Sequence, residues 1–429
     1  MTARESSTPV PSGKLPFEWQ GVAAWCMYDW ANSPFPTVVT TFIFAAYYTG
    51  TVAVDANDAL SQWGLMQGLA AIVIALASPI LGAIADRSGR RKPWLAVFTL
   101  VMAAGSGLLW MVHPSPSDEW LLLWLVGLAT VAFELGMVFY NAMLSSLAPH
   151  NWLGRVSGWG WGVGYFGGLL CLVIVLYGFI QPEVPPLGLA KESAQHVRIA
   201  GPLVALWILL FSLPIFLRTP DRKSTGVSAS TAVREGLATL WHTLRHLRHH
   251  GSIARFLVAR FFYTDGINTM FVFGGIYAAG TFGMSVAEVA MFGILLNATA
   301  GLGALGFSWV DDLIGAKRTV LIAIAGILIV GLPILVITSK TWFFILGALL
   351  GIFFGPAQAA SRSLMARMVP KDLETEMFGL FALTGKAAAI LSPLTVALVV
   401  TATGSQRAAM ATVLPVIMIG ALLLLKVRD

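Results

Sequence analysis

Ionisable side chains lie inside apolar stretches of this 429-residue chain. Asp29, Asp265 and Lys386 each lie within a run of apolar residues that is long enough to cross a bilayer. A charge at the centre of a membrane helix costs roughly 3 kcal/mol or more, so such residues usually serve transport or pair with one another. We therefore expect carboxylates that bind a cation or exchange a proton, and an amine that holds an anionic group.

Further polar residues share helical faces with these groups. Side chains that are three, four or seven residues apart lie on one face of a helix. The pairs with such spacing are Asp29 with Asn32, Asp265 with Asn268, Glu134 with Asn141, and Gln358 with Arg362. At ~1.5 Å rise per residue, Asp29, Asp265 and Lys386 lie near the middle of a ~30 Å hydrocarbon core. By the same estimate Glu134 lies somewhat deeper than the centre, and Arg362 lies at the far edge of its span.

The composition identifies the elements that must position these residues. Hydrophobic residues make up 57% of the chain and charged residues 11%, whereas soluble domains carry about 25% charged residues. The apolar runs are continuous and about 20 residues long, as spanning helices require, without the alternation of a membrane β-barrel. The sequence therefore predicts an all-α membrane protein.

Twelve spans are expected, in two groups of six. The first six lie near 21–49, 62–85, 94–112, 120–147, 156–180 and 199–217, and the second six near 253–280, 287–309, 319–338, 342–366, 376–401 and 407–425. The predicted parts are a tail (1–20), a six-helix bundle (21–217), a connector (218–251) and a second six-helix bundle (252–429). Apolar residues in the connector have helical spacing and predict an amphipathic helix on the membrane face. They are Val233, Leu237, Leu240, Leu244 and Leu247.

The distribution of basic residues predicts the orientation. Of 27 Lys and Arg residues, 20 fall on the side that holds both termini and the connector, and four fall on the other side. Basic loops stay in the cytoplasm, so both termini are expected there. This distribution accounts for the net charge of +6 without a nucleic-acid partner. Histidines of the connector, at 242, 246, 249 and 250, are read as part of a solvated basic face, and no metal site is expected.

The two halves repeat one another. Tyr28-Asp29 followed by Asn32 recurs as Tyr263-Thr264-Asp265 followed by Asn268. The loop GAIADRSGRRK after the second span recurs as WVDDLIGAKR after the eighth, and the segment that begins at Asn141 recurs from Arg362. Two repeated halves in one orientation predict a transporter whose substrate site lies at their interface. The expected fold is therefore two pseudo-symmetric six-helix bundles.

These motifs carry a resemblance to a known family. Gly82-x-x-x-Asp86-Arg87-x-Gly89-Arg90-Arg91 resembles the signature loop of the major facilitator superfamily. The chain further resembles the autophagy-related vacuolar amino-acid effluxers and their bacterial relatives. The motifs behind this resemblance are Tyr28 to Ser33, Arg155 to Gly158, Tyr263 to Gly266, Gly355-Pro356-x-Gln358-x-x-Ser361-Arg362-Ser363, and Phe378-Gly379 with Gly385-Lys386.

The resemblance implies that spans one, four, seven and ten line a central cavity. Asp29, Glu134 and Asp265 would then meet a substrate cation or exchange a proton, and Lys386 and Arg362 would hold an anionic group. The other residues expected at this site are Tyr28, Asn32, Asn141, Trp161, Tyr165, Tyr263, Asn268 and Gln358. An alternative is an internal ion pair, such as Asp265 with Lys386, that joins helices without touching a substrate.

The repeated loops imply a cytoplasmic gate. By resemblance, charge contacts between helix ends stabilise the outward-open state and break as the transporter turns inward. The residues expected at this gate are Gly82, Asp86, Gly89, Arg90, Arg91, Asp312, Gly315, Lys317 and Arg318. The alternative is that these charges only determine the orientation of the chain in the membrane.

We expect a secondary transporter for a small polar metabolite, with an amino acid or related zwitterion favoured and with proton coupling. A phosphate-loop lookalike at Gly379 to Ala387 has five residues between its glycines and lacks the Ser or Thr that binds magnesium, so no nucleotide or other cofactor is expected. Two alternatives stay open: a sugar or glycoside symporter driven by Na⁺ or H⁺, and an intramembrane lipid-modifying enzyme. The expected setting is a monomer in the lipid bilayer of a bacterial inner membrane.

Overall fold

The computed structural model describes residues 18–245, 251–388 and 391–428, and the regular elements of this part of the chain are helices. A helix satisfies its backbone hydrogen bonds within one segment, which is why apolar runs adopt it in a bilayer. Most of the expected tail lies outside the described residues. Helix α1 begins at Trp19.

The helices follow the order of the apolar runs. The first half holds α1 (Trp19–Asn32), α2 (Phe44–Tyr47), α3 (Ala56–Ser88), α4 (Lys92–Leu108), α5 (Glu119–Leu147), α6 (Leu153–Val175), α7 (Gln195–Arg198) and α8 (Ala200–Arg218). Helix α9 (Ala229–Arg245) stands between the halves. The second half holds α10 (Gly251–Phe282), α11 (Val286–Ile314), α12 (Ala316–Ile334), α13 (Lys340–Met368), α14 (Glu374–Ala387), α15 (Leu391–Thr403), α16 (Gln406–Ala411) and α17 (Val413–Leu425).

Nine helical segments in the described part of the chain are long and apolar enough to cross a membrane. The expected first, seventh and eleventh spans are not among them. The first is interrupted after Asn32, the seventh carries Arg260 and Asp265, and the eleventh is divided between α14 and α15. The all-helical membrane fold is confirmed, whereas the count of twelve spans stays a prediction.

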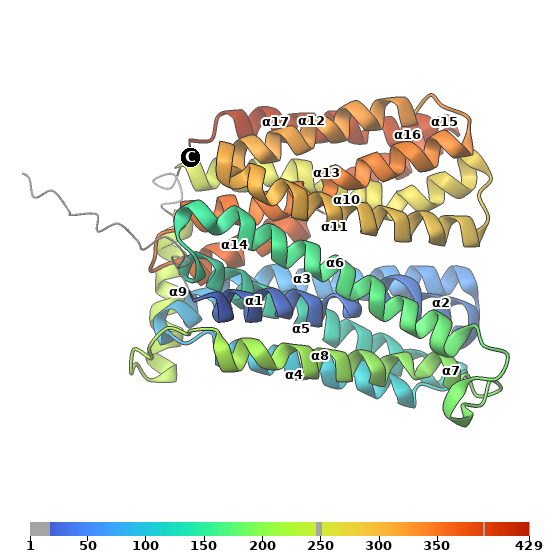
Figure 1. Cartoon of the computed structure of the whole chain (residues 1–429), viewed down its shortest axis with the longest axis horizontal. Coiled ribbons are helices and arrows are strands. Elements are labelled where there is room, and N and C mark those ends of the chain that lie inside the picture. The colour runs from blue at the N-terminus through green and yellow to red at the C-terminus, as the bar shows by residue number, and fades with distance from the viewer. Residues whose placement is uncertain (1–17, 246–250, 389–390, 429) are drawn as a thin grey trace, which may run out of the picture.

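The two halves form separate bundles, and their closest helix contacts are those of α6 with α11 and of α3 with α14. In Figure 1 the first half, blue to green, lies below the second half, yellow to red. Helix α6 packs on α11, where a Cβ atom at Gly158 would collide with the carbonyl oxygen of Ala304. Helix α14 packs on α3, where a Cβ atom at Gly379 would lie 2.6 Å from Cα of Pro79. Small residues thus let backbones of opposite halves approach closely.

Two of the expected spans are interrupted, the first and the eleventh. Helix α1 ends at Asn32, and a wider π-helical turn follows at Phe35–Phe42, next to Pro34 and Pro36. Proline lacks the N–H group that a regular helix needs, which accounts for the interruption. The second irregularity separates α14, which ends at Ala387, from α15.

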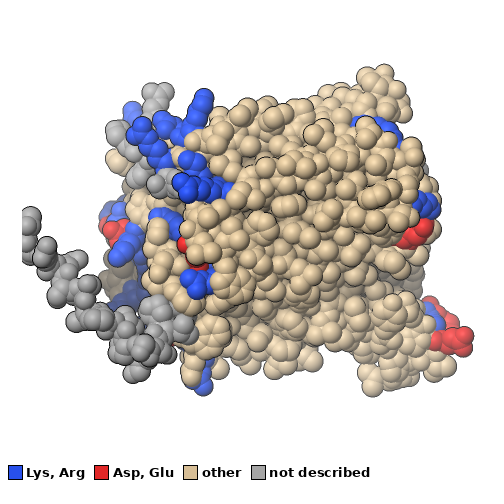
Figure 2. Space-filling view, turned by 45° about the horizontal axis from the view of Figure 1, so that its top comes forward, with Lys and Arg blue, Asp and Glu red and all other residues tan. Residues whose placement is uncertain are grey.

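Basic side chains gather at one end of the molecule, on the left in Figure 2, which is also the end that carries the C-terminus in Figure 1. We call this the basic end. It includes Arg87, Arg91, Arg155, Arg222 and Arg367, whose ion pairs and hydrogen bonds link the helix ends there. The other end, which carries the charged pair Lys340 and Glu288, is called the opposite end.

Helix α9 lies at the basic end and packs on α3 (Figure 1). Nη2 of Arg87 donates to Oγ1 of Thr239 at 2.6 Å. The buried stripe of α9 comprises Ala232, Gly236, Leu240 and Thr243. Val233 and Leu237, which belong to the apolar face expected from sequence, are each 42% exposed. The sequence assigned the apolar face of α9 to the membrane. The stripe that is buried against the protein is a different face, which shares Leu240 with it.

Candidate functional site

A buried ion pair joins the two halves. Asp29 lies on α1 and Arg362 on α13, and Nη1 of Arg362 is 3.1 Å from Oδ2 of Asp29. The two side chains are only 7% and 2% exposed. Tyr140 of α5 donates its hydroxyl to the same carboxylate oxygen at 2.8 Å. Distance along the chain had placed Arg362 at the edge of its span, but the pairing puts it at the depth of Asp29.

Arg362 is further bonded to the first half. Nε donates to Oγ of Ser157 at 2.9 Å, and Nη2 donates to the Ser157 carbonyl at 2.6 Å. Nη1 also reaches Oδ1 of Asn141 at 3.3 Å. The guanidinium lies 4.8 Å from the ring centroid of Trp25 and 5.5 Å from that of Trp161. These hydrogen bonds compensate the cost of removing both charges from water, so the ion pair stabilises the contact between the halves.

A second ion pair crosses the interface between Glu134 of α5 and Lys386 of α14. Nζ of Lys386 lies 2.5 Å from Oε1 of Glu134. These side chains are 25% and 26% exposed, in contrast to the nearly sealed pair of Asp29 and Arg362. The ion pair between Asp265 and Lys386 that the sequence left open is not the one formed. Lys386 faces the first half, and its pair is the more accessible of the two.

Asp265 of α10 binds the beginning of α15, the second part of the expected eleventh span. Its carboxylate accepts the backbone N–H groups of Leu391 at 3.1 Å and Ser392 at 2.8 Å, and also the Ser392 hydroxyl. These are the first residues of α15, where N–H groups have no partner within the helix. Asp265 therefore caps a half-helix within its own bundle, and the structure does not bring it to Asp29.

The two repeated tyrosines are engaged away from the ion pairs. Tyr28 exchanges a hydrogen bond with Thr99 of α4 at 2.8 Å between oxygens. Tyr263 does the same with Ser361 of α13 at 2.6 Å. Both tyrosines are buried, with each bond lying inside one half. Their geometry indicates that they fix helix packing in the two halves in a similar way.

The other expected site residues differ in exposure. Asn32 is buried, and its Nδ2 lies 3.3 Å from Sδ of Met137. Partly exposed residues are Asn268, Gln358, Trp161 and Tyr165. The rings of Trp161 and Tyr165 lie 5.9 Å apart, and the indole nitrogen of Trp161 is buried without a described hydrogen-bond partner. Asn141 and Trp161 thus gather around Arg362, with Tyr165 beside Trp161.

The repeated acidic residues of the loops cap helices of the opposite half. Asp86 accepts the backbone N–H groups of Thr375 at 3.1 Å and Glu376 at 2.9 Å, in the first turn of α14. Asp312 accepts those of Gly154 at 2.8 Å and Arg155 at 3.1 Å, in the first turn of α6. A carboxylate at a helix N-terminus satisfies orphan donors and favours the helix dipole.

Arginines extend both caps into ion-pair clusters. Arg91 pairs with Glu374 and lies 3.6 Å from Asp86, and Arg222 lies 2.5 Å from Glu374. In the other cluster Arg367 pairs with Asp311 and lies 2.9 Å from Asp312, while Arg155 lies 2.7 Å from Asp312. The acidic members of both clusters are nearly buried. The basic end is therefore closed by charge contacts between the halves.

The remaining loop residues have varied roles. Gly89 and Gly315 have φ of 85° and 93°, which only glycine adopts without strain. Gly82 lies directly under the Thr375 carbonyl, where no side chain fits. Nζ of Lys317 donates to the Val427 carbonyl at 2.5 Å. The other two residues expected at the gate, Arg90 and Arg318, are exposed at the surface.

Sequence reasoning missed several residues that complete these clusters. Tyr140 and Ser157 bind the central pair, Glu374 pairs with Arg91 and Arg222, and Arg367 pairs with Asp312. The repeat offered a signal only for the capped helix ends, since the segment from Asn141 aligns with that from Arg362 and so places Gly154 on Thr375. The common residue types Tyr and Ser carried no signal of their own.

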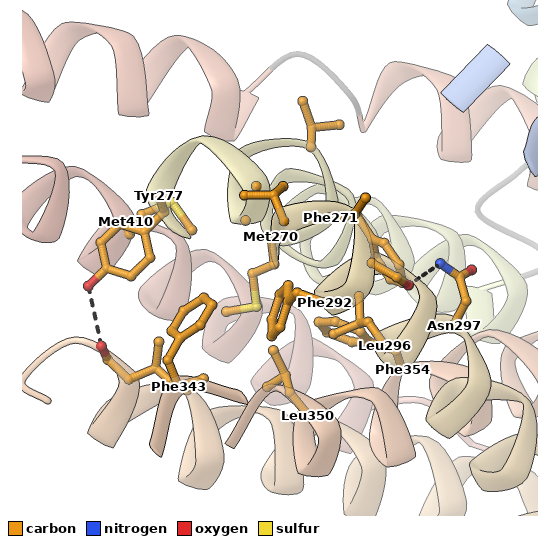
Figure 3. Close-up of a pocket in the computed structure, with 18 of the residues that line it drawn as sticks. Met270, Phe271, Tyr277, Phe292, Leu296, Asn297, Phe343, Leu350, Phe354 and Met410 are labelled. Atoms are coloured by element: carbon orange, nitrogen blue, oxygen red, sulfur yellow. Dashed lines mark hydrogen bonds between the residues drawn. The ribbon is translucent and has the colours of Figure 1, made fainter. Parts of the chain in front are cut away.

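A cavity of about 420 Å³ lies mostly in the second half and reaches Thr41 and Phe42 of the first half (Figure 3). Helices α10 to α13, α16 and α17 line the rest of it with aromatic and aliphatic side chains such as Met270, Phe292 and Phe343, and none of its lining residues is charged. Its polar groups bond to nearby carbonyls, because Tyr277 donates to Ile334 at 3.2 Å and Asn297 to Gly293 at 2.8 Å. This cavity is suited to apolar groups and contains none of the predicted site residues.

The described residues contain no group of three or more His, Cys, Asp or Glu side chains that could hold a metal ion. Three of the four connector histidines, at 246, 249 and 250, lie outside the described residues. The remaining one, His242, is exposed on α9. The described site chemistry is therefore that of ion pairs and hydrogen bonds.

Comparisons with known proteins agree with this architecture. The family described as "Vacuole effluxer Atg22 like" matches residues 153–428, and the Major Facilitator Superfamily matches residues 4–172. The uncharacterized MFS-type transporter YxiO of Bacillus subtilis is 27% identical over 94% of this chain and 93% of its own length. Autophagy-related protein 22 of Kluyveromyces lactis is 28% identical, and the match spans 59% of this chain and about half (54%) of that protein.

Solved structures show the same fold. The transporter FucP in its outward conformation has a TM-score of 0.73 at 16% identity, covering 95% of this chain and 98% of its own. The proton:xylose symporter XylE has a TM-score of 0.70 at 14% identity, covering 95% of both chains. At these identities the likeness concerns the fold.

Proposed function

Because the chain belongs to the vacuole effluxer Atg22 like family of the major facilitator superfamily, we propose that it is a secondary transporter for an amino acid or a related zwitterion. Transporters of this superfamily carry small molecules across membranes rather than modify them. The substrate class is inferred from the chemistry of the interface between the halves.

The pair of Glu134 and Lys386 carries this proposal. It combines one negative and one positive group, comes from opposite halves, and keeps a quarter of each side chain exposed. A zwitterion presents the complementary charges: its ammonium pairs with Glu134 and its carboxylate with Lys386. Substrate binding then replaces one ion pair with two, so charges that are already desolvated in the site stay paired.

The basic-end clusters support alternating access. Asp86 and Asp312 cap helices of the opposite half, and Arg91 and Arg367 reinforce these contacts. We infer that this arrangement is the outward-facing state, closed on the basic side. Inward opening requires the clusters to separate. The buried ion pair of Asp29 and Arg362 then either stays formed while the halves rotate about it or breaks after the clusters have separated.

The orientation of the protein in the membrane is proposed from the basic end. We assign the basic end to the cytoplasm, because basic segments are retained there. With that assignment the C-terminus and the connector are cytoplasmic, as we expect for the N-terminus. The relative from Bacillus subtilis, which matches over nearly the whole chain, supports the cell membrane of a bacterium as the location. We propose a monomer as the working unit.

Proton coupling is proposed at Glu134. Glu134 is the carboxylate of the partly exposed pair between the halves, so it can be reached from the open side of the site.

A sugar is the second candidate substrate, and one observation favours it. Trp161 and Tyr165 form a partly exposed aromatic pair beside the central cluster, and the Trp161 indole nitrogen has no described partner. The exposed face of such a ring can stack on a sugar. The zwitterion is preferred because the exposed ion pair has no counterpart in a neutral sugar.

The test is uptake by proteoliposomes that contain the full chain, measured with a panel of labelled amino acids and sugars. Each solute is offered with and without an imposed inward proton gradient, and liposomes without protein give the background. The proposal predicts uptake of one or more amino acids that the proton gradient accelerates. Uptake of sugars without amino acids would overturn the zwitterion proposal, and amino-acid uptake unaffected by the gradient would overturn the coupling proposal.

A further inference from the structure

Arg260 is a third charged residue beside the exposed ion pair. It lies on α10, is 6% exposed, and faces the last turns of α14, which carries Lys386. Its Nη1 donates to the Phe381 carbonyl at 2.7 Å and to Oγ1 of Thr384 at 3.1 Å. The guanidinium also lies 3.5 Å from the ring centroid of Phe381. Arg260 is therefore held in place by contacts that leave its charge without a carboxylate.

Part of the guanidinium is unused. Nε is buried and has no described hydrogen-bond partner, and in the described part of the chain no hydrogen bond is made by Nη2. An unpaired buried donor of a charged group is costly, so a residue with only a packing role would be expected to satisfy it. The open donors suggest that Arg260 has a partner that the protein itself does not supply.

The position of Arg260 relative to Lys386 supports a shared ligand. Gly385 precedes Lys386, and a Cβ atom at position 385 would lie 3.1 Å from Nη1 and 3.2 Å from Nη2 of Arg260. The Arg260 guanidinium therefore packs against the backbone of Gly385, which directly precedes Lys386. Glu134 and Arg260 both lie beside α14, Glu134 through its ion pair with Lys386 and Arg260 through its contacts with Phe381 and Thr384, so the three charges belong to one neighbourhood.

This neighbourhood has an excess of positive charge. Lys386 and Arg260 supply two cationic groups, whereas Glu134 is the carboxylate that faces them. Asp265, on the same helix as Arg260, is committed to the first turn of α15, and Asp29 is committed to Arg362. A substrate with one ammonium and one carboxylate would leave one cation unpaired. A substrate with one ammonium and two carboxylates would pair with all three groups.

We propose that Arg260 is a second carboxylate-binding residue of the site and that it makes an acidic amino acid, with net negative charge, the preferred substrate. This inference rests on the proposed amino-acid transport and names its substrate class. Lys386 holds one carboxylate, Arg260 holds the other, and Glu134 holds the ammonium. Arginine suits this role because its fork of donors binds carboxylates in a fixed geometry.

The test compares uptake of glutamate, aspartate, leucine and lysine by proteoliposomes that contain wild type, Arg260→Met or Arg260→Lys. Wild type is expected to prefer the acidic solutes. Arg260→Met should lower the ratio of acidic to neutral uptake by about ten-fold or more, as the loss of a charge-assisted hydrogen bond implies. Arg260→Lys keeps the charge and should retain part of the preference.

Arg407→Met is the matched control. Arg407 also donates to two carbonyls, those of Leu335 and Ile337, and lies over the Phe282 ring, but it belongs to the opposite end. Its replacement should leave the preference among solutes unchanged. Thermal unfolding of each variant identifies misfolded protein. If Arg260→Met fails to fold, Arg260→Lys provides the test: a reduced preference for acidic solutes supports the role of Arg260, and an unchanged preference contradicts it.

The outcomes separate the two claims. Wild-type uptake that favours leucine over glutamate would overturn the role of Arg260 and leave amino-acid transport standing. An unchanged ratio in Arg260→Met would do the same. Absence of uptake for every amino acid in a panel where sugars are taken up would overturn the proposed function and this inference together.

Discussion

Asp86 and Asp312 make the same interaction from opposite halves: each accepts two backbone N–H groups in the first turn of a helix that belongs to the other half. The repeat aligns Gly154 with Thr375, and these are the residues that the two carboxylates bind. The gate thus follows the internal symmetry of the chain down to individual donors.

Removing one of these caps should shift the transporter away from its basic-end-closed state. A helix cap contributes about 1 kcal/mol, and Asp86→Ala also removes the acid beside Arg91, so the ratio of closed to open molecules should fall roughly five-fold or more. Spin labels at Arg90→Cys and Lys371→Cys, both exposed positions at the basic end, would report the separation of the halves. The native cysteines Cys26 and Cys171 are buried.

The expected result is a distance distribution shifted to longer separations in Asp86→Ala. Asp118→Ala is the control, because Asp118 bonds to His113 in an exposed loop between α4 and α5. Unchanged distances in Asp86→Ala would mean that the cap does not hold the gate.

Enlarging a glycine at the helix contact should have a similar effect by steric means. A side chain at Gly379 would overlap the backbone of Ser78 and Pro79, so Gly379→Leu should disfavour closure by about 1–3 kcal/mol. Gly306→Leu is the control, since a Cβ atom there meets nothing within 4 Å. The same spin-label pair measures the outcome. A closed distribution in Gly379→Leu would contradict the role of this contact.

The pair of Asp29 and Arg362 should show strong coupling in stability. Each single replacement leaves a buried charge without its counter-ion, which costs about 3–5 kcal/mol, whereas the double replacement leaves neither. Asp29→Asn and Arg362→Met should each lower the unfolding temperature in detergent, and the double variant should recover part of the loss. Additive losses in this double-mutant cycle would contradict a direct pair.

Asp265 should behave as a cap rather than as a proton or substrate group. Asparagine keeps one of the two acceptor oxygens of Asp265, whereas alanine keeps neither and costs about 1 kcal/mol. Asp265→Asn should therefore keep transport with part of the cap, and Asp265→Ala should lose protection from hydrogen exchange in the first turn of α15. Loss of transport in a stable Asp265→Asn protein would show that the carboxylate has a further role.

The sequence was sufficient for features that depend on local pattern. Apolar runs predicted the helices, and the repeat predicted that Asp86 and Asp312 have equivalent places. Mid-span charges identified Asp29, Glu134 and Lys386 as interface candidates. The division between α14 and α15 was not predicted, because the apolar run from 376 to 401 was read as one span.

The partners of those charges could not be read from the sequence. The pairing of Asp29 with Arg362, and of Glu134 with Lys386, depends on how the helices of one half align in depth with those of the other. Residue spacing fixes the face of each helix but not this alignment. Asn141 and Arg362 are a case in point: they are equivalent in the repeat and meet across the interface at 3.3 Å.

The central claim is that the substrate enters between Glu134 and Lys386. The most direct measurement is amino-acid uptake by proteoliposomes with Glu134→Gln, Lys386→Met and the double control Glu288→Gln/Lys340→Met, which removes an exposed ion pair of the same residue types. If both residues bind the substrate, each single variant should lose about ten-fold or more of the uptake rate, whereas the control should retain it. Wild-type uptake in both single variants, with folding intact, would contradict it.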